Sequence, residues 1–167
     1  KRIPQSVKGR RAHPPKPQKI LIEEMNLKEY SKALASAIAS TANKSLLKNK
    51  SSECPIVMDN SFEKLTKTKQ VISVLQALKV YSLVEKSKEK THYVSGIRHR
   101  SKRTKFPKSV LVVVGNGGLK AARNLSGVDV VSAKELQVRH LAPGTHAGRV
   151  AVYTEDALKQ IKERFEK

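Results

Sequence analysis

The sequence has few aromatic residues and almost no cysteine. Phe, Trp and Tyr together make up 4% of its 167 residues, and Trp is absent. The chain therefore has too few aromatic rings for a surface that binds nucleic acid mainly by stacking bases on them. The single cysteine, Cys54, excludes an intramolecular disulfide and is too little for a zinc site built on CxxC pairs. This cysteine content suits a reducing compartment.

Long apolar runs are also missing. The longest clear one, residues 110–114, is far too short to span a bilayer, and no signal-peptide pattern stands at the start. We therefore expect a soluble, intracellular protein without a membrane partner. The chain begins with Lys1 inside a basic stretch. From this beginning we expect either that the chain was processed or that an N-terminal portion is missing.

Acidic residues are scarce relative to basic ones. Asp and Glu number 14 against 34 Lys and Arg, which leaves a formal net charge of +20. A free globular enzyme would gain nothing from this self-repulsion, so the charge predicts a polyanionic partner that is bound mainly through phosphates. The length of 167 residues and the apolar content of 38% suit one domain with basic extensions.

Residues 1–19 contain no acidic residue and cannot form a core. Four prolines, from Pro4 to Pro17, bias the backbone of this segment toward extended conformations. We expect an extended RNA-binding arm that becomes ordered only with its partner, and a disordered tail that adds solubility is the alternative. The candidate RNA-binding residues of the arm are Lys1, Arg2, Lys8, Arg10, Arg11, His13 and Lys16.

Residues 20–167 show the pattern of an α/β domain. Apolar residues recur at helical spacing near 27–48, 68–78 and 155–166. Short β-branched runs predict strands near 56–58, 110–114, 128–131 and 149–153, and the last three suit burial on both faces. This order of elements predicts an open, mainly parallel sheet flanked by helices. The expected apolar faces are Leu27, Tyr30, Leu34, Ile38 and Leu46 in the first helix and Leu158, Ile161 and Phe165 in the last.

A second basic stretch, residues 86–108, interrupts this pattern. Only Glu89 opposes its charge, and like charges so close together repel one another in an isolated chain. We interpret the stretch as a loop of the α/β domain that binds phosphates, and an ordinary solvated loop is the alternative. Its candidate RNA-binding residues are Arg98, His99, Arg100, Lys102, Arg103 and Lys105.

The glycines at 115–118 follow a predicted buried strand, as a dinucleotide-binding turn would. Lys120 stands where the third glycine of that motif belongs, and the next strand ends at Ser132 rather than at an acid that would bind ribose. We interpret the glycines as a tight structural turn and expect no cofactor. The histidines lack metal-ligand spacings and no nucleophile stands in a catalytic pattern, so we expect no metal, no catalytic residue and no small-molecule substrate.

A loop of small residues lies between His140 and Arg149. Two interpretations of it stay open. It is either a long turn or a turn shaped for the close approach of another backbone.

Several strings in this sequence are specific enough to compare with known families. The longest is RIPQSVKGRRAHPPK at residues 2–16, and others are residues 96–108 and 110–118, AARNL at 121–125, LAPG at 141–144 and Gly148-Arg149. Together these strings resemble the archaeal and eukaryotic-type family of large-subunit ribosomal protein L-four. Family members carry an additional N-terminal part, so we expect this chain to begin at the returning limb of the family's long loop.

The resemblance implies a structural role rather than an enzymatic one. It implies an α/β domain on the surface side of the ribosome and a loop that penetrates the large-subunit ribosomal RNA toward the peptide exit tunnel. It also implies a role in subunit assembly, with ribosomal RNA and neighbouring ribosomal proteins as partners in the cytoplasm. Two other functions stay open: a nucleotide-dependent RNA-modifying enzyme that uses Gly115–Gly118, and a chromatin-type module that binds duplex DNA.

Overall fold

The computed structural model describes residues 3–47, 54–94, 103–115 and 118–166. The chain divides into two compact units, Lys1–Tyr30 and Ser31–Lys167. This boundary lies further along the chain than the one expected from composition, after residue 19. Residues 3–26 of the first unit contain no helix or strand, and helix α1 (Leu27–Ala42) begins at its end.

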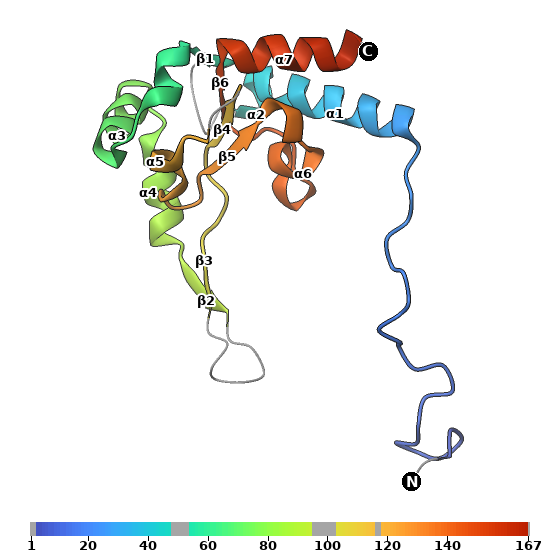
Figure 1. Cartoon of the computed structure of the whole chain (residues 1–167). Helices are drawn as coiled ribbons and strands as arrows, with labels where there is room; N and C mark the ends of the chain where they lie inside the picture. Colours follow the sequence, from blue (N-terminus) through green and yellow to red (C-terminus); the bar gives the residue numbers. More distant parts are fainter. Residues whose placement is uncertain (1–2, 48–53, 95–102, 116–117, 167) are drawn as a thin grey trace. The chain divides into compact units, whose positions relative to one another are not determined.

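The second unit is built on a sheet of four parallel strands. The strands lie in the order β1-β6-β4-β5, and each neighbouring pair is parallel. This arrangement confirms the predicted α/β class and the mainly parallel sheet, which Figure 1 shows at the centre of the unit. The strands are β1 (Ile56–Met58), β4 (Leu111–Val114), β5 (Asp129–Ser132) and β6 (Ala151–Thr154).

Helices cover both faces of this sheet, with α3, α4 and α5 on one side and α6 and α7 on the other (Figure 1). No helix within the described ranges is both long and apolar enough to cross a membrane. A separate antiparallel hairpin connects α4 to β4. The remaining elements are α2 (Lys44–Leu47), η1 (Asn60–Lys64), α3 (Thr68–Ala77), α4 (Tyr81–Glu89), β2 (His92–Val94), β3 (Arg103–Lys105), α5 (Lys120–Arg123), η3 (Ala133–Glu135), α6 (Val138–Leu141), η4 (Pro143–Thr145) and α7 (Glu155–Glu166).

Strand β4 shows why the sheet supports two hydrophobic cores. Successive side chains of a strand point to opposite faces. Val112 and Val114 therefore pack with residues of α3, α4 and α5, whereas Leu111 and Val113 pack with residues of α1, α6 and α7. All four residues of β4 are buried, as the continuous apolar run predicts for a central strand.

The two edge strands are less buried than β4. In β5, burial on both faces is wrong, because Asp129, Val131 and Ser132 are only partly buried. In β1, Val57 is 47% exposed. Both strands have a neighbour on one side only, since the strand order places them at the edges of the sheet. A local apolar run does not reveal which strand lies at an edge.

The helix expected over residues 27–48 is two helices. α1 ends at Ala42, and α2 begins after Asn43, whose side-chain Oδ1 accepts a hydrogen bond from the Ser45 backbone N at 3.0 Å. This break resets the helical phase. Leu47 is consequently buried, whereas Leu46, which was expected on the apolar face, is 47% exposed. The expected burial of Leu27 is also wrong, since Leu27 is 87% exposed at the first residue of α1.

The apolar face of α7 is also rotated from the expected one. Ala157 and Ile161 are the buried residues of this helix, whereas Leu158 and Phe165 are 37% and 39% exposed. One physical reason is a contact outside the apolar pattern. Arg164 Nη1 donates a hydrogen bond to the Leu136 carbonyl at 2.9 Å, which holds this side of the helix against the segment after η3.

The basic stretch 86–108 is not one continuous loop. Its first residues complete α4, where Ser87 is buried, and its middle contains strands β2 and β3. Ser87 Oγ donates a hydrogen bond to the Pro107 carbonyl at 2.6 Å. This bond ties the end of the helix to the segment that leaves the hairpin.

Candidate nucleic-acid interface

The basic residues of the first unit lie on a chain without a core. Lys8, Arg10, Arg11, His13 and Lys16 are all exposed, and none of them has an ion pair with another described residue. Apolar residues nearby are exposed too, with Ile3 at 64% and Val7 at 83%. The RNA-dependent ordering of this arm stays a prediction. Lys1 and Arg2 lie outside the described residues.

Two turns shape the beginning of this segment. The Ser6 and Gly9 backbone N–H groups donate to the Ile3 and Ser6 carbonyls at 3.2 and 2.8 Å. A Cβ at Gly9 would overlap the Ile3 carbonyl oxygen, so the turn requires glycine at this position. These turns present Lys8 and Arg10 on a locally defined backbone.

The hairpin β2–β3 carries the second group of candidate residues. Its register pairs His92 with Lys105 and Val94 with Arg103. Opposed residues of an antiparallel pair lie on the same face, so His92 and Lys105, both exposed, present two polar groups together. The other candidates of this stretch, Arg98, His99, Arg100 and Lys102, lie outside the described residues.

Tyr93 is a candidate that sequence reasoning missed. It lies on β2 opposite Thr104, and its side chain is 75% exposed. An exposed ring on a hairpin that also carries basic residues can stack on a base. The available signal was the short β-prone run His92-Tyr93-Val94 before Ser95-Gly96, which is typical of a strand that enters a turn.

Arg149 is a basic residue that is buried and stabilises the fold rather than facing solvent. It is 4% exposed, and all three nitrogens of its guanidinium donate hydrogen bonds. The acceptors are the carbonyls of Ser109 at 2.9 Å, His140 at 2.7 Å, Val110 at 3.1 Å and Gly127 at 3.3 Å. Arg149 therefore joins the beginnings of β4, β5 and β6 and is not available to an outside phosphate.

Asp129 supplies the negative charge for this cluster. Its carboxylate lies 2.9 Å from Arg149 Nη1 and 2.7 Å from Lys108 Nζ. Burial raises the pKa of Asp129, but the hydrogen bonds and charges of Lys108 and Arg149 outweigh burial and leave this pKa below its ordinary value. Burial lowers the pKa of Arg149, and Asp129 partly offsets that effect. We call these three residues the Arg149 cluster.

His140 lies beside the Arg149 cluster as a hydrogen-bond acceptor. Its Nδ1 accepts from the Gln137 backbone N at 3.3 Å, which requires that nitrogen to be unprotonated. Burial and the charge of Arg139 lower the pKa of His140, and Asp129 opposes them. This histidine therefore supports the first turn of α6.

The turn after β4 is bound to the protein's own side chains. The Gly115 backbone N donates to Glu63 Oε1 at 2.7 Å, and Thr154 Oγ1 donates to the same carboxylate oxygen at 2.6 Å. A carboxylate at this amide occupies the position that a cofactor phosphate would need and repels one. This contact favours the interpretation of the glycines as a tight structural turn rather than a cofactor site. Gly117 itself lies outside the described residues.

The loop before Arg149 makes a close approach to the backbone of Leu46 in the same chain. Gly148 has φ +83°, and a Cβ there would lie 2.9 Å from the Leu46 Cβ and 3.2 Å from its carbonyl oxygen. Of the two open interpretations of this loop, the structure supports close approach to another backbone.

The single cysteine is a packing residue. Cys54 is partly buried and packs against the core that faces α3.

Comparison with known proteins decides the family. A family model described as the ribosomal protein L4/L1 family matches residues 1–164. The chain belongs to this family. It is similar to large ribosomal subunit protein uL4 of Methanocaldococcus jannaschii, with 48% identity over 99% of this chain and 69% of the relative. Its identity to uL4 of Methanococcus vannielii is 46%, over 98% of this chain and 68% of that relative. Its identity to uL4 of Archaeoglobus fulgidus is 47%, over 96% of this chain and 67% of that relative.

Membership of the L4/L1 family confirms the resemblance found in the sequence. The matched range contains both basic segments and the whole sheet. This family is structural and non-enzymatic, so neither the nucleotide-dependent enzyme nor the chromatin-type module is supported. The RNA contacts of individual residues stay predictions.

Proposed function

We propose that this chain is a structural constituent of the large ribosomal subunit in the cytoplasm. The observation that carries the proposal is the family match over residues 1–164, together with relatives that are named large ribosomal subunit proteins. The chain's partners are then ribosomal RNA and neighbouring ribosomal proteins. Its work is to bind and hold RNA, and no catalytic step is required.

The distribution of charge supports RNA as the main partner. The chain carries a net charge of +20, and the exposed cations of the first unit have no carboxylate partner among the described residues. RNA phosphates supply the missing counter-charge, and each neutralised phosphate releases condensed counterions, which drives binding. The inferred contacts are made by the arm residues Lys1, Arg2, Lys8, Arg10, Arg11, His13 and Lys16 and by Arg98, His99, Arg100, Lys102, Arg103 and Lys105.

The arm has a distinct part in this proposal. Residues 1–19 are the returning limb of a loop that penetrates the RNA toward the peptide exit tunnel, and the sheet unit remains outside as its anchor. A segment without a core has to lose conformational freedom when it binds, and the phosphate contacts offset that entropic cost. Such an arm gathers separate RNA segments while the subunit assembles.

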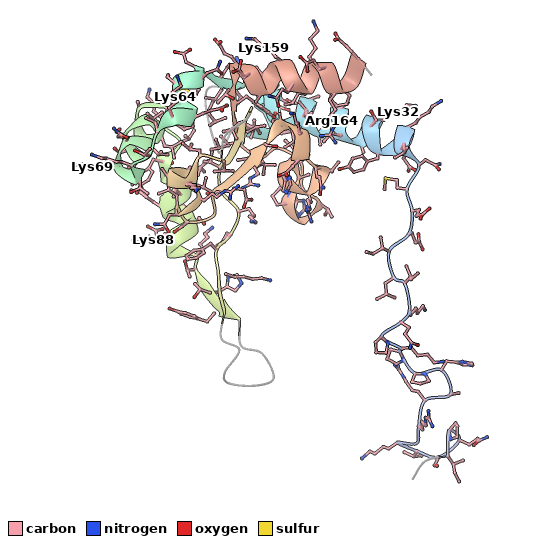
Figure 2. The ribbon with its side chains drawn as sticks, viewed as in Figure 1. Lys32, Lys64, Lys69, Lys88, Lys159 and Arg164 are labelled. Carbon is pink, nitrogen blue, oxygen red and sulfur yellow. The ribbon has the colours of Figure 1, made fainter. Side chains whose placement is uncertain are left out.

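A salt titration tests the RNA contacts of the arm. Binding of the protein to a large-subunit ribosomal RNA transcript is measured at several salt concentrations, with duplex DNA as competitor. The variant Lys8→Ala/Arg10→Ala/Arg11→Ala should lower the slope of log affinity against log salt by about 0.7 to 0.9 for each lost contact. The matched control, Lys32→Ala/Lys64→Ala/Lys69→Ala, removes three exposed lysines of the second unit, which Figure 2 labels.

Equal slopes in the wild type and the arm variant would contradict the assignment of these three residues. Stronger competition by duplex DNA than by ribosomal RNA at the same salt would favour the chromatin-type alternative. A second measurement addresses the ribosomal role itself. The protein should remain with intact large subunits through a high-salt wash, and its complete release would contradict the proposal.

A further inference from the structure

A cavity of about 500 Å³ lies at the base of the hairpin, within the second unit. Three segments form it: the C-terminal half of α4, the chain that leaves β3, and the loop from η4 to β6. None of its lining residues is acidic.

The cavity has two cations that no carboxylate neutralises. Lys86 lies in the last turn of α4, and Lys90 caps the end of this helix, where its backbone N donates to the Lys86 carbonyl at 3.1 Å. Both side chains are exposed. Neither forms an ion pair within the part of the chain that the structure describes. Lys108 and Arg149 differ from them, because Asp129 already pairs with both. Two free positive charges therefore remain for an anion.

The rest of the lining is apolar or polar without charge. Leu83, Pro107 and Pro143 provide apolar surface, and the exposed His146 provides the only aromatic ring among the lining residues. A phosphate alone would use the lysines and leave this apolar surface uncovered. A ligand that combines an anion with a flat apolar group would use both parts.

The loop that carries His146 has an unusual backbone. Gly144 and Thr145 have φ values of +69° and +67°, which place two successive residues in the left-handed region. A residue other than glycine, such as Thr145, rarely adopts this conformation unless its surroundings require it, and such positions concentrate at ligand-binding loops. A Cβ at Gly144 would contact nothing within 4 Å, so the positive φ rather than close packing accounts for the glycine there.

We propose that this cavity binds one unstacked nucleotide of the ribosomal RNA. The base lies on the apolar surface and stacks on the His146 ring, and its phosphate contacts Lys86 and Lys90. Sites of this volume commonly hold small ligands, and RNA is recognised largely through bases that have left the helical stack. The inference rests on the proposed function, since it names a site for the same RNA.

Continuity with the hairpin favours RNA over a free nucleotide. Lys90 stands two residues before His92 on β2, and Pro107 stands two residues after Lys105 on β3. An RNA strand held by the basic hairpin therefore reaches the cavity without leaving the protein surface. A single base fits a concave site of this kind, whereas a paired base cannot enter it.

Three variants test the site through different properties. Lys86→Ala/Lys90→Ala removes the free charges and should lower the salt slope by about 0.7 for each contact to single-stranded RNA. Leu83→Trp fills the cavity without changing its charge and should weaken binding with no change in slope. His146→Ala removes the ring and should weaken binding about ten-fold, which is within the effect of losing one stacked base.

The control removes the same charge elsewhere. Lys64→Ala/Lys69→Ala alters two exposed lysines that do not line the cavity, and its RNA affinity and slope should stay near those of the wild type. Reactivity of RNA 2′-hydroxyls toward an acylating reagent supplies the decisive measurement. One nucleotide should be protected in the wild-type complex and become reactive with both Leu83→Trp and His146→Ala, while thermal unfolding shows that the variants are folded.

The outcomes separate this inference from the proposed function. Wild-type protein that binds ribosomal RNA no better than an unrelated RNA would overturn the proposed function and the site with it. Specific wild-type binding with unchanged affinity and unchanged protection in His146→Ala and Lys86→Ala/Lys90→Ala would overturn the site alone. An equal loss of affinity in the Lys64→Ala/Lys69→Ala control would also overturn it, because the effect would then follow total charge. Saturable binding of free nucleotides without RNA would identify a small-molecule site instead.

Discussion

The first unit and the Arg149 cluster use the same basic residue types in opposite ways. Arg10 and Arg11 are exposed and lack an ion pair among the described residues. Arg149 is 4% exposed, lies 2.9 Å from the Asp129 carboxylate and donates to four backbone carbonyls. Net charge therefore overstates the charge that RNA can reach. The difference teaches that a basic residue must be classified by its partners before it is assigned to binding.

Loss of Arg149 should produce the largest effect. Arg149→Ala removes one of the two cations that pair with Asp129 and one hydrogen-bond donor from each of four backbone carbonyls, so we expect the free energy of unfolding to fall by about 3 kcal/mol. Chemical denaturation measures this change. Arg139→Ala, an exposed neighbour, serves as the control and should change stability little. A stable Arg149→Ala protein with weakened RNA binding would reverse the comparison.

Three arginines of the second basic stretch should show the opposite behaviour. Arg98→Ala/Arg100→Ala/Arg103→Ala should lower the salt slope by about 2, and RNA affinity near 0.1 M salt by about a hundred-fold, if each residue contacts one phosphate. Stability should stay near that of the wild type. RNA titrations and denaturation curves on the same variant provide both measurements. An unchanged slope would mean that these residues only face solvent.

Gly127, whose carbonyl accepts a hydrogen bond from Arg149, extends the comparison to the backbone beside the Arg149 cluster. Its φ is +71°, and a Cβ there would overlap the Pro107 carbonyl oxygen and the Ser87 hydroxyl. Gly127→Ala should therefore cost more than about 1 kcal/mol of stability, because the side chain adds a clash to an unfavourable φ. The midpoint of denaturant unfolding measures the loss. A change in salt slope without a loss of stability would contradict this structural role.

The smallest expected effect is the pH dependence of stability. The folded-state pKa of His140 lies below 6.5, so the unfolded chain binds more protons at that residue as the pH falls. The stabilising contribution is complete above pH 6.5 and is lost as the pH falls through the folded-state pKa. Asp129 adds a second loss below pH 3.8, since its folded-state pKa is also lowered.

Denaturation at a series of pH values checks this dependence. His140→Gln should remove the loss that begins below pH 6.5 and leave the loss at lower pH from Asp129. A wild type whose stability rises as the pH falls from 7 to 5.5 would contradict the assignment.

Local sequence patterns predicted much of the fold. They also predicted the excess of basic residues, but not which of these residues are buried. The helical spacing of Val71 and Leu75 predicted the buried face of α3, and the valine run 110–114 predicted the central strand. Local patterns did not reveal that Leu47 rather than Leu46 is buried, because Asn43 interrupts the helix between Ala42 and Lys44. The hairpin was missed since its strands have three residues each, too few for a clear alternation.

The sequence by itself determined the excess of positive charge, the absence of a core in residues 1–19, and the alternation of helices and strands in the rest. These properties depend on composition and on spacings within one element, which are present in the linear order. Tertiary structure alone decided that Arg149 is internal, that Glu63 accepts from Gly115, and that β1 and β5 are edges. Each of these depends on groups far apart in the chain, and only folding brings their charges, donors and acceptors within contact distance.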